Sequence, residues 1–374
     1  MAISKTVLAP TTPLIGIKAE PNSSGYGVSV DSSGADGTAY RQLPVLQATR
    51  PSIEIVRESR LLSGRGLVKH KSDTYTSSKG GTVTTPFEFW ATPKLLAQFL
   101  TLVAQEHSES GSYIHTTEIG GQGTMISSVG GTISSNLPHS VNLAYDTGTA
   151  GEGIRINGNI VNELTMAFSA GSNNNLMTLS GNFYSGHSYQ GSGNGLSTSG
   201  LEQDFSGGTW VAPETSYYSM SDMDTKQLDV DGDTLQDLIL KDFSITITNN
   251  AVRSPSHNSV GDAEYIGITE YAVTGSMGVK YDAEIDYGAG MNVLQDFVDG
   301  DTMTLKLIWG DGTVSSAGEM NILAEIQHVS MPDQDLSDAG VFHTLNFECV
   351  QAGTSDGDEA LQVQLFNGES QSAW

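Results

Sequence analysis

Hydrophobic residues in this chain repeat with a period of two, and that repeat limits the folds the chain can adopt. Such alternation gives a strand one buried face and one exposed face, as in antiparallel sheets. Clusters of Gly, Asn, Asp and Ser separate the alternating segments, as turns require. The sequence therefore predicts a mainly β fold of sandwich or barrel type. The alternating sets are Ile53 and Ile55; Val141, Leu143 and Tyr145; Leu164, Met166 and Phe168; Phe243, Ile245 and Ile247; Met277, Val279 and Tyr281; Met303, Leu305, Leu307 and Trp309; Ile322, Ala324 and Ile326; His343, Leu345 and Phe347; and Leu361, Val363 and Leu365.

Two segments have a helical pattern instead. In the first, Thr92 is placed to cap the helix and Pro93 suits the first helical position. The second is shorter and is followed by Gly300, a residue typical of helix C-termini. We expect each helix to pack one apolar face on a sheet. The apolar residues are Leu95, Leu96, Phe99, Leu100 and Val103 in the first helix, and Met291, Leu294, Phe297 and Val298 in the second.

Composition and element order predict three parts of the chain. Residues 1–48 are rich in Ser, Thr, Gly and Pro, and we expect them to form an extended N-terminal arm. The Gly-, Ser- and Asn-rich stretch after Ser185 is the best boundary between two halves. The halves, 49–212 and 213–374, would be tandem β-sandwich or barrel domains, each with one short helix. This internal duplication rests on the order of the elements, since the halves share negligible sequence identity.

The charge balance excludes several classes of function. The chain has 43 acidic and 17 basic residues, and its formal net charge is −26. A surface this acidic repels phosphates, which argues against a protein that reads DNA or RNA. Two interpretations of the acidic surface stay open: it forms a wall that DNA passes without binding, or it keeps an abundant protein in solution.

Cysteine content and hydropathy limit the environment of the protein. Cys349 is the only cysteine, so the sequence allows no disulfide within one chain and no cysteine-based zinc site. The first residues lack the apolar core of a signal peptide, and no apolar run has the length of a membrane span. We expect synthesis in the cytoplasm and no association with membranes.

Sequence motifs for catalysis or cofactor binding are missing. The chain has no phosphate-binding loop, dinucleotide-binding turn, nucleophilic-serine elbow or paired-histidine zinc motif. Its histidines, among them His107, His115 and His139, are scattered, and we interpret them as polar loop residues. With 7% aromatic residues, the chain also lacks the aromatic surface typical of β-fold glycan hydrolases. The sequence therefore predicts no enzyme activity and no cofactor.

One acidic cluster is a weak candidate for calcium. Its aspartates occupy the first, third, fifth and ninth positions of a loop like that of an EF-hand. However, Thr234 stands where the loop requires glycine, and Leu240 stands where it requires a bidentate glutamate. We favour an acidic turn before the strand at Phe243 over a metal site. The candidate ligands are Asp229, Asp231, Asp233 and Asp237.

Five short motifs follow one another in a distinctive order. They are residues 17–20 with 25–27; 58–60 with 64–66; 85–89 before Pro93; 139–143 with 158–166; and 241–250 with 273–277. In this order they resemble the larger tail tube proteins of long-tailed, siphovirus-type bacteriophages, over about residues 14–370. The last motif, which includes Val273-Thr274-Gly275-Ser276, is the most specific. The chain departs from the family in its longer Ser/Gly-rich start and in insertions near Asn173 and Gly191.

The resemblance implies a structural virion protein that assembles with itself into stacked rings around a channel for viral DNA. In members with two tube domains, three chains make a ring with pseudo-sixfold symmetry. Further implied partners are tail tip and terminator proteins, together with passing DNA that is not bound by sequence. Two alternatives stay open: a calcium-binding β-sandwich adhesin that uses Asp229 to Asp237, and a tail-associated glycan hydrolase.

Overall fold

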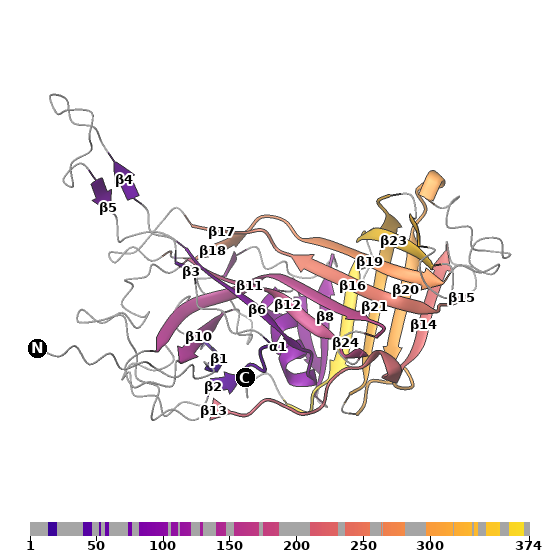
Figure 1. Ribbon diagram of the computed structural model, residues 1–374, viewed down its shortest axis with the longest axis horizontal. Helices are drawn as coiled ribbons and strands as arrows, with labels where there is room; N and C mark the ends of the chain where they lie inside the picture. Colours follow the sequence, from indigo (N-terminus) through magenta and orange to yellow (C-terminus); the bar gives the residue numbers. More distant parts are fainter. Residues whose placement is uncertain are drawn as a thin grey trace, which may run out of the picture.

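The computed structural model describes residues 14–20, 40–46, 52–53, 57–59, 74–76, 82–103, 106–110, 113–120, 128–129, 140–146, 153–171, 175–186, 210–230, 236–254, 263, 265–280, 297–316, 318–330, 333–335, 342–351 and 359–369. Most of the described strands belong to one large mixed sheet, which folds over into two layers (Figure 1). The predicted mainly β fold is confirmed.

The first layer contains three strands from each predicted half of the chain. Each strand is antiparallel to its neighbour in the order β6-β12-β11-β16-β19-β23. The two halves meet where β11 pairs with β16, with Leu164 opposite Ile247. The strands are β6 (Val83–Trp90), β12 (Thr178–Ser185), β11 (Ile154–Ser169), β16 (Leu240–Thr248), β19 (Ala272–Lys280) and β23 (Phe342–Cys349).

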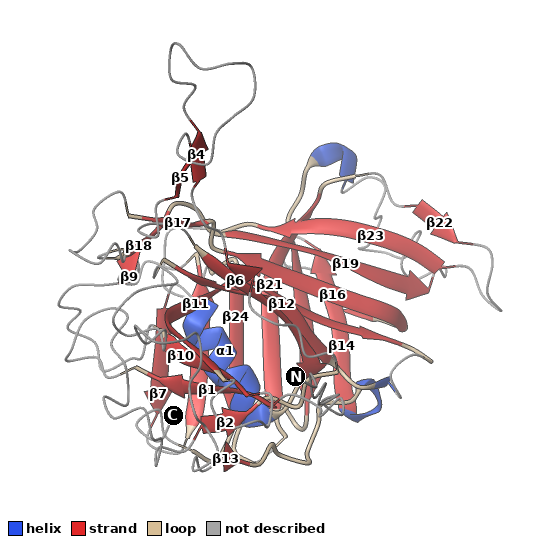
Figure 2. Ribbon diagram, turned by 60° about the vertical axis from the view of Figure 1, so that its left-hand side comes forward, coloured by secondary structure: helices blue, strands red, loops and turns tan. Residues whose placement is uncertain are grey.

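The second layer has the antiparallel order β14-β20-β21-β24-β8-β7. The layers join where Ile326 of β21 pairs with Cys349 of β23. Figure 2 shows the strands of the two layers running in different directions, as in a sandwich. The strands are β14 (Met223–Val230), β20 (Met303–Trp309), β21 (Met320–His328), β24 (Leu361–Phe366), β8 (Ile114–Ile119) and β7 (Glu106–Ser110).

The length of β11 allows it to join a further group of strands. Its first half pairs with β10 (Val141–Asp146), and its second half pairs with β16 along the same edge. Beyond β10 lie β1 (Leu14–Ala19), β2 (Tyr40–Gln42) and β13 (Trp210–Val211), which is parallel to β2. The fold therefore continues past the two layers at one end.

Shorter elements decorate this framework. A three-stranded sheet consists of β17 (Ala251–Arg253), β18 (Ile266–Ile268) and β9 (Ser128–Val129). The strands β4 (Arg57–Ser59) and β5 (Thr74–Thr76) pair with each other in a separate hairpin. The remaining elements are β3 (Ser52–Ile53), β15 (Gln236–Asp237), β22 (Asp333–Asp335) and the 3-10 turn η4 (Met220–Asp222).

The alternating side chains predicted from the sequence form the core between the layers. The first layer contributes Phe243, Ile245 and Ile247 of β16 to this core. The second layer contributes Met303, Leu305 and Leu307 of β20, and all six side chains are buried. The predicted strands are thus confirmed wherever the residues are described; Ile55 and Tyr281 lie outside the described residues. Burial of a large apolar side chain contributes roughly 1.5–3 kcal/mol, so these faces hold the layers together.

Helix α1 (Pro93–Val103) confirms the first helical prediction. Every residue of α1 except Lys94 is buried, because the helix contacts β11 in one layer and β8 and β24 in the other. The predicted apolar face is buried against a sheet, as expected, and the opposite face of the helix is buried as well. Phe99 packs on the rings of Phe87, Phe89 and Phe183, which lie on two strands of the first layer.

The second helical segment is only partly described. Phe297, Val298 and Asp299 are helical, and Gly300 follows with φ +74, as a C-terminal glycine cap requires. Val298 is 74% exposed, so the expected packing of this residue on a sheet is wrong. Met291 and Leu294 lie outside the described residues.

Part of the segment expected to be an N-terminal arm forms strands instead. Ile15 and Ile17 of β1 are buried, and β1 pairs with β10 along its full length. The sequence pattern was too short to reveal this strand, which is fixed by a partner more than 120 residues away. The boundaries of the arm and of the two tandem domains stay a prediction. No helix among the described residues is long and apolar enough to cross a membrane.

Candidate functional site

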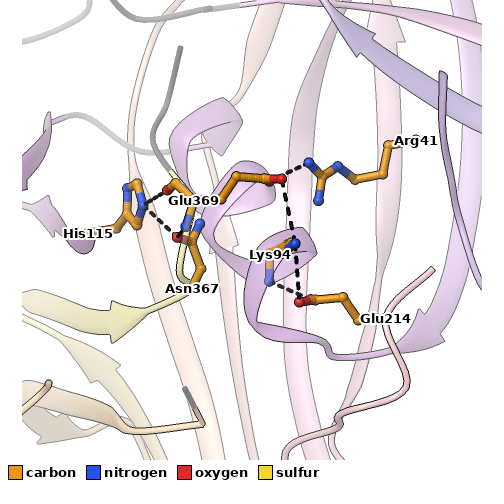
Figure 3. A network of polar contacts seen from close by, with 6 residues as sticks. All are labelled: Arg41, Lys94, His115, Glu214, Asn367 and Glu369. Carbon is orange, nitrogen blue, oxygen red and sulfur yellow. Dashed lines mark hydrogen bonds and ion pairs between the residues drawn. The ribbon is translucent and has the colours of Figure 1, made fainter. Parts of the chain in front are cut away.

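A network of polar contacts joins four distant parts of the chain at one end of α1 (Figure 3). Its centre is the carboxylate of Glu369, which forms ion pairs with Arg41 of β2 and, at 3.5 Å, with Lys94 of α1. Glu214 lies on the other side of Lys94, with 3.9 Å between Oε1 and Nζ. The network therefore fixes residue 369 against the start of the helix and against β2.

Glu214 also caps helix α1. Its Oε2 accepts a hydrogen bond of 2.9 Å from the backbone N–H of Lys94, one of the free donors in the first turn. A negative charge at this position also interacts favourably with the helix dipole. The predicted cap is wrong: the hydroxyl of Thr92 has no hydrogen-bond partner among the described residues. Sequence position alone favoured Thr92, whereas the fold brings in a residue 120 positions away.

Two buried histidines extend the network into the core. Nε2 of His115 lies 2.9 Å from Oδ1 of Asn367 and 2.9 Å from the carbonyl oxygen of Glu369. Both partners are acceptors, so Nε2 of His115 carries the hydrogen. Nδ1 of His115 then accepts from Nε2 of His107 at 3.2 Å, and Nδ1 of His107 accepts from the Thr117 hydroxyl at 2.8 Å. All these hydrogen bonds are satisfied when both histidines are neutral.

The environment keeps His107 neutral. Burial and, to a smaller extent, the neighbouring His115 lower the pKa of His107 to about 3. The interpretation of these histidines as loop residues is wrong, because they lie on the adjacent strands β7 and β8. The spacing of eight residues around Gly111 was the one available signal, since a hairpin there brings the two side chains to one face.

A second polar centre surrounds Glu20, just after β1. Its carboxylate is buried and accepts hydrogen bonds from the Ser140 hydroxyl at 2.6 Å, the Asn142 amide at 2.9 Å and the Gly158 N–H at 2.6 Å. Hydrogen bonds from these uncharged donors offset the free-energy cost of burying the carboxylate. Glu20 therefore connects β1 to β10 and β11. The sequence contained this residue in a motif but gave no role for it.

The calcium candidates do not form a described cluster. Asp229 is on β14, where its backbone pairs with Thr304, and Asp237 of β15 is exposed and accepts a hydrogen bond of 2.8 Å from Gln227. Asp231 and Asp233 lie outside the described residues. Within the part of the chain that is described, no group of three or more His, Cys, Asp or Glu side chains could hold a metal ion. Calcium binding by these aspartates is thus untested.

Sheet edges are the other surfaces that matter for binding, because an unpaired edge is a template for another strand. β3 covers one end of β6, and the N–H of Leu46 donates to the carbonyl of Glu88 at the other end. Pro86 lies between them and has no N–H to donate. Among the described strands, β7 pairs with β8 only, so its second edge has no described strand beside it.

Comparisons with known proteins agree with the motif order. The model of one protein family, described as phage tail tube protein, matches residues 14–349. The match covers the polar centre around Glu20 and all five motifs. It also covers the network at the end of α1, apart from Asn367 and Glu369 themselves. No curated protein matches the chain.

Proposed function

Because the chain belongs to the phage tail tube protein family, we propose that copies of it assemble into stacked rings around a channel for viral DNA. The protein is a structural component of the virion tail and not an enzyme. The family match over nearly the whole chain is the observation that carries the proposal. It also disfavours the alternatives of a calcium-dependent adhesin and a glycan hydrolase.

The arrangement of strands supports a ring of three chains with pseudo-sixfold symmetry. In the first layer, β6, β12 and β11 come from the first predicted half, and β16, β19 and β23 come from the second. One chain would then supply two of six similar groups of strands, and closing the ring would satisfy exposed sheet edges.

The net charge supports passage of DNA without binding. A basic channel would hold phosphates through counterion release, whereas a chain with a formal charge of −26 repels them. We further propose synthesis in the host cytoplasm, a tail of the long, siphovirus type, and contacts with tail tip and terminator proteins at the two ends of the tube.

Electron microscopy tests the proposal directly. The purified protein is concentrated, incubated without ligand and examined by negative stain. Hollow rods or stacked rings are the expected result, and averaged end views give the symmetry. Particles that remain monomeric both alone and with purified tail tip complexes would contradict self-assembly into a tube.

A further inference from the structure

The outward face of the first layer carries short, uncharged side chains. They alternate with buried core residues along β12, β11, β16 and β19, so they point away from the second layer. Thr274 is exposed and the others are partly exposed. All except Ala167 and Asn346 carry a hydroxyl group. This surface, which we call the hydroxyl face, consists of Thr178, Ser180, Thr165, Ala167, Ser244, Thr246, Thr274, Ser276 and Asn346.

The pairing of the strands arranges the hydroxyl face in two rows. The rows are Ser180, Thr165, Thr246 and Thr274, and beside them Thr178, Ala167, Ser244, Ser276 and Asn346. Within the rows, Thr165 and Thr246 share a hydrogen bond of 2.8 Å between their hydroxyl oxygens, and Ser244 and Ser276 share one of 2.9 Å. Part of the hydrogen-bonding capacity is therefore used inside the sheet, and the side chains form a level surface.

The outward face of the second layer has a different character. Its partly exposed side chains are longer, and several are charged, as in Lys306 of β20 and Glu325 of β21. Glu325 accepts a hydrogen bond of 2.8 Å from the Thr304 hydroxyl, and Glu118 of β8 accepts one of 2.9 Å from the amide of Gln362. Short uncharged side chains are thus a property of the first layer and not of exposed strands in general.

Acidic residues border the hydroxyl face. Glu88 of β6 lies at one end of a row, and Glu348 of β23 lies at the other end. Glu163 and Asp242 lie on the same side of the sheet, two residues before the face on β11 and β16. Negative charge therefore surrounds the hydroxyl groups and is not placed among them.

Lysines are also kept away from the hydroxyl face. The lysines of β16 and β19 are Lys241 and Lys280, and both lie beyond Asp242 at the same end of these strands. Nζ of Lys241 lies 5.6 Å from the centre of the Phe342 ring, which holds this cation outside the rows.

We infer that the hydroxyl face lines the channel, so that duplex DNA passes over uncharged hydroxyl groups. The inference rests on the proposed function, since it requires a channel. Cations on the wall would hold phosphates through counterion release, and the hydroxyl face has none. Hydroxyl groups give phosphates little that water does not also give. The bordering carboxylates repel phosphates over about 8 Å at physiological salt, which keeps DNA off the edges of the face.

Cysteine labelling locates the hydroxyl face in assembled rods. Burial, together with nearby carboxylates, raises the pKa of Cys349, the only cysteine, to about 12, so the wild type serves as an unreactive blank. The probes are Ser180→Cys and Thr274→Cys, one in each predicted half of the chain. The matched control is Gln362→Cys, on the outward face of the second layer. Each variant is treated with a small fluorescent maleimide and with a maleimide coupled to serum albumin, which is wider than a channel for duplex DNA.

The two reagents separate the three places where the face can lie. In free subunits, all three variants should react with both reagents. In rods, Ser180→Cys and Thr274→Cys should still react with the small maleimide but lose reaction with the albumin conjugate, while Gln362→Cys keeps both reactions. Reaction of the face cysteines with the conjugate would place the face outside the tube, and loss of both reactions would place it between copies. Either result overturns the inference and leaves the tube proposal standing.

Paired lysines test the chemistry of the wall. Thr165→Lys/Ser244→Lys adds cations to the hydroxyl face, and Thr165→Gln/Ser244→Gln is the control of similar length without charge. Rods are incubated with short duplex DNA, treated with nuclease and sedimented. We expect nuclease-protected DNA in the lysine rods alone, and its loss as the salt concentration rises. Equal amounts in the two variants, or no protected DNA in the lysine rods, would overturn the assignment of this face to the channel.

Failure of the proposed function gives a different result. If the wild type forms no rods, alone or with purified tail tip complexes, the tube proposal fails, and the inference fails with it because no channel exists. If rods form, the labelling pattern decides the inference while the tube proposal stands.

Discussion

The side chain of Glu214 accepts a hydrogen bond from the backbone N–H of Lys94, although the two residues are 120 positions apart. The start of the buried helix α1 therefore depends on a segment that follows the predicted boundary between the halves. Helix caps are usually supplied by the residue just before the helix. Here the cap is a long-range contact, and it belongs to the network that also holds Glu369.

Removing the Glu214 cap should destabilise the protein. We expect Glu214→Ala to lower the free energy of unfolding by about 1 kcal/mol, because a helix donor loses its acceptor. Glu214→Gln keeps an acceptor oxygen and loses only the charge, so it should cost less. Urea titration followed by circular dichroism measures both. Equal losses for the two variants would show that charge rather than the hydrogen bond matters.

Acid should weaken the fold through His107. Its pKa of about 3 lies below the ordinary value of 6.5, so the unfolded chain takes up a proton that the folded chain refuses. The stability from neutral His107 is complete above pH 6.5 and is lost as the pH falls towards 3, with a slope of up to about 1.4 kcal/mol per pH unit. His107→Gln should flatten this slope in urea titrations between pH 7 and 4.5. His343→Gln serves as the control, and an unchanged slope in His107→Gln would contradict the prediction.

The glycine in the most specific motif should not tolerate a methyl group. A Cβ on Gly275 of β19 would lie 2.4 Å from Cζ of Phe347 and 2.5 Å from the carbonyl oxygen of Ser244. We expect Gly275→Ala to cost roughly 1–3 kcal/mol through overpacking. Gly267→Ala is the matched control, since the nearest atom to its new Cβ would be Cγ2 of Val252, 3.6 Å away. Thermal unfolding compares the two, and similar melting temperatures would refute this account.

The buried carboxylate of Glu20 should also be sensitive. Glu20→Ala leaves the donors of Ser140, Asn142 and Gly158 without this acceptor, which we expect to cost about 3 kcal/mol. Glu20→Gln can keep its oxygen towards Asn142 and Gly158 while its amide donates to the Ser140 hydroxyl. It should therefore restore most of the stability in denaturant titrations. A Gln variant as unstable as the Ala variant would indicate that the charge itself is required.

The sequence predicted those features that depend on neighbours along the chain. The alternation in Met303–Trp309 and the helix from Pro93 are local patterns, and both are present in the structure. The polar centres depend on pairs such as Glu214 with Lys94, or Glu20 with Ser140, which no spacing reveals. The burial of α1 on all sides escaped prediction for a related reason: its polar side chains, Gln98 and Thr101, are enclosed by a second layer whose position the helix sequence does not encode.

The position of β24 has a consequence for the timing of synthesis. This strand lies between β8 and β21, yet residues 361–366 are translated long after residues 114–119. Until residues 361–366 have been translated, β24 cannot link β8 to β21, and the second layer stays incomplete. A growing chain therefore cannot present a finished subunit to its neighbours.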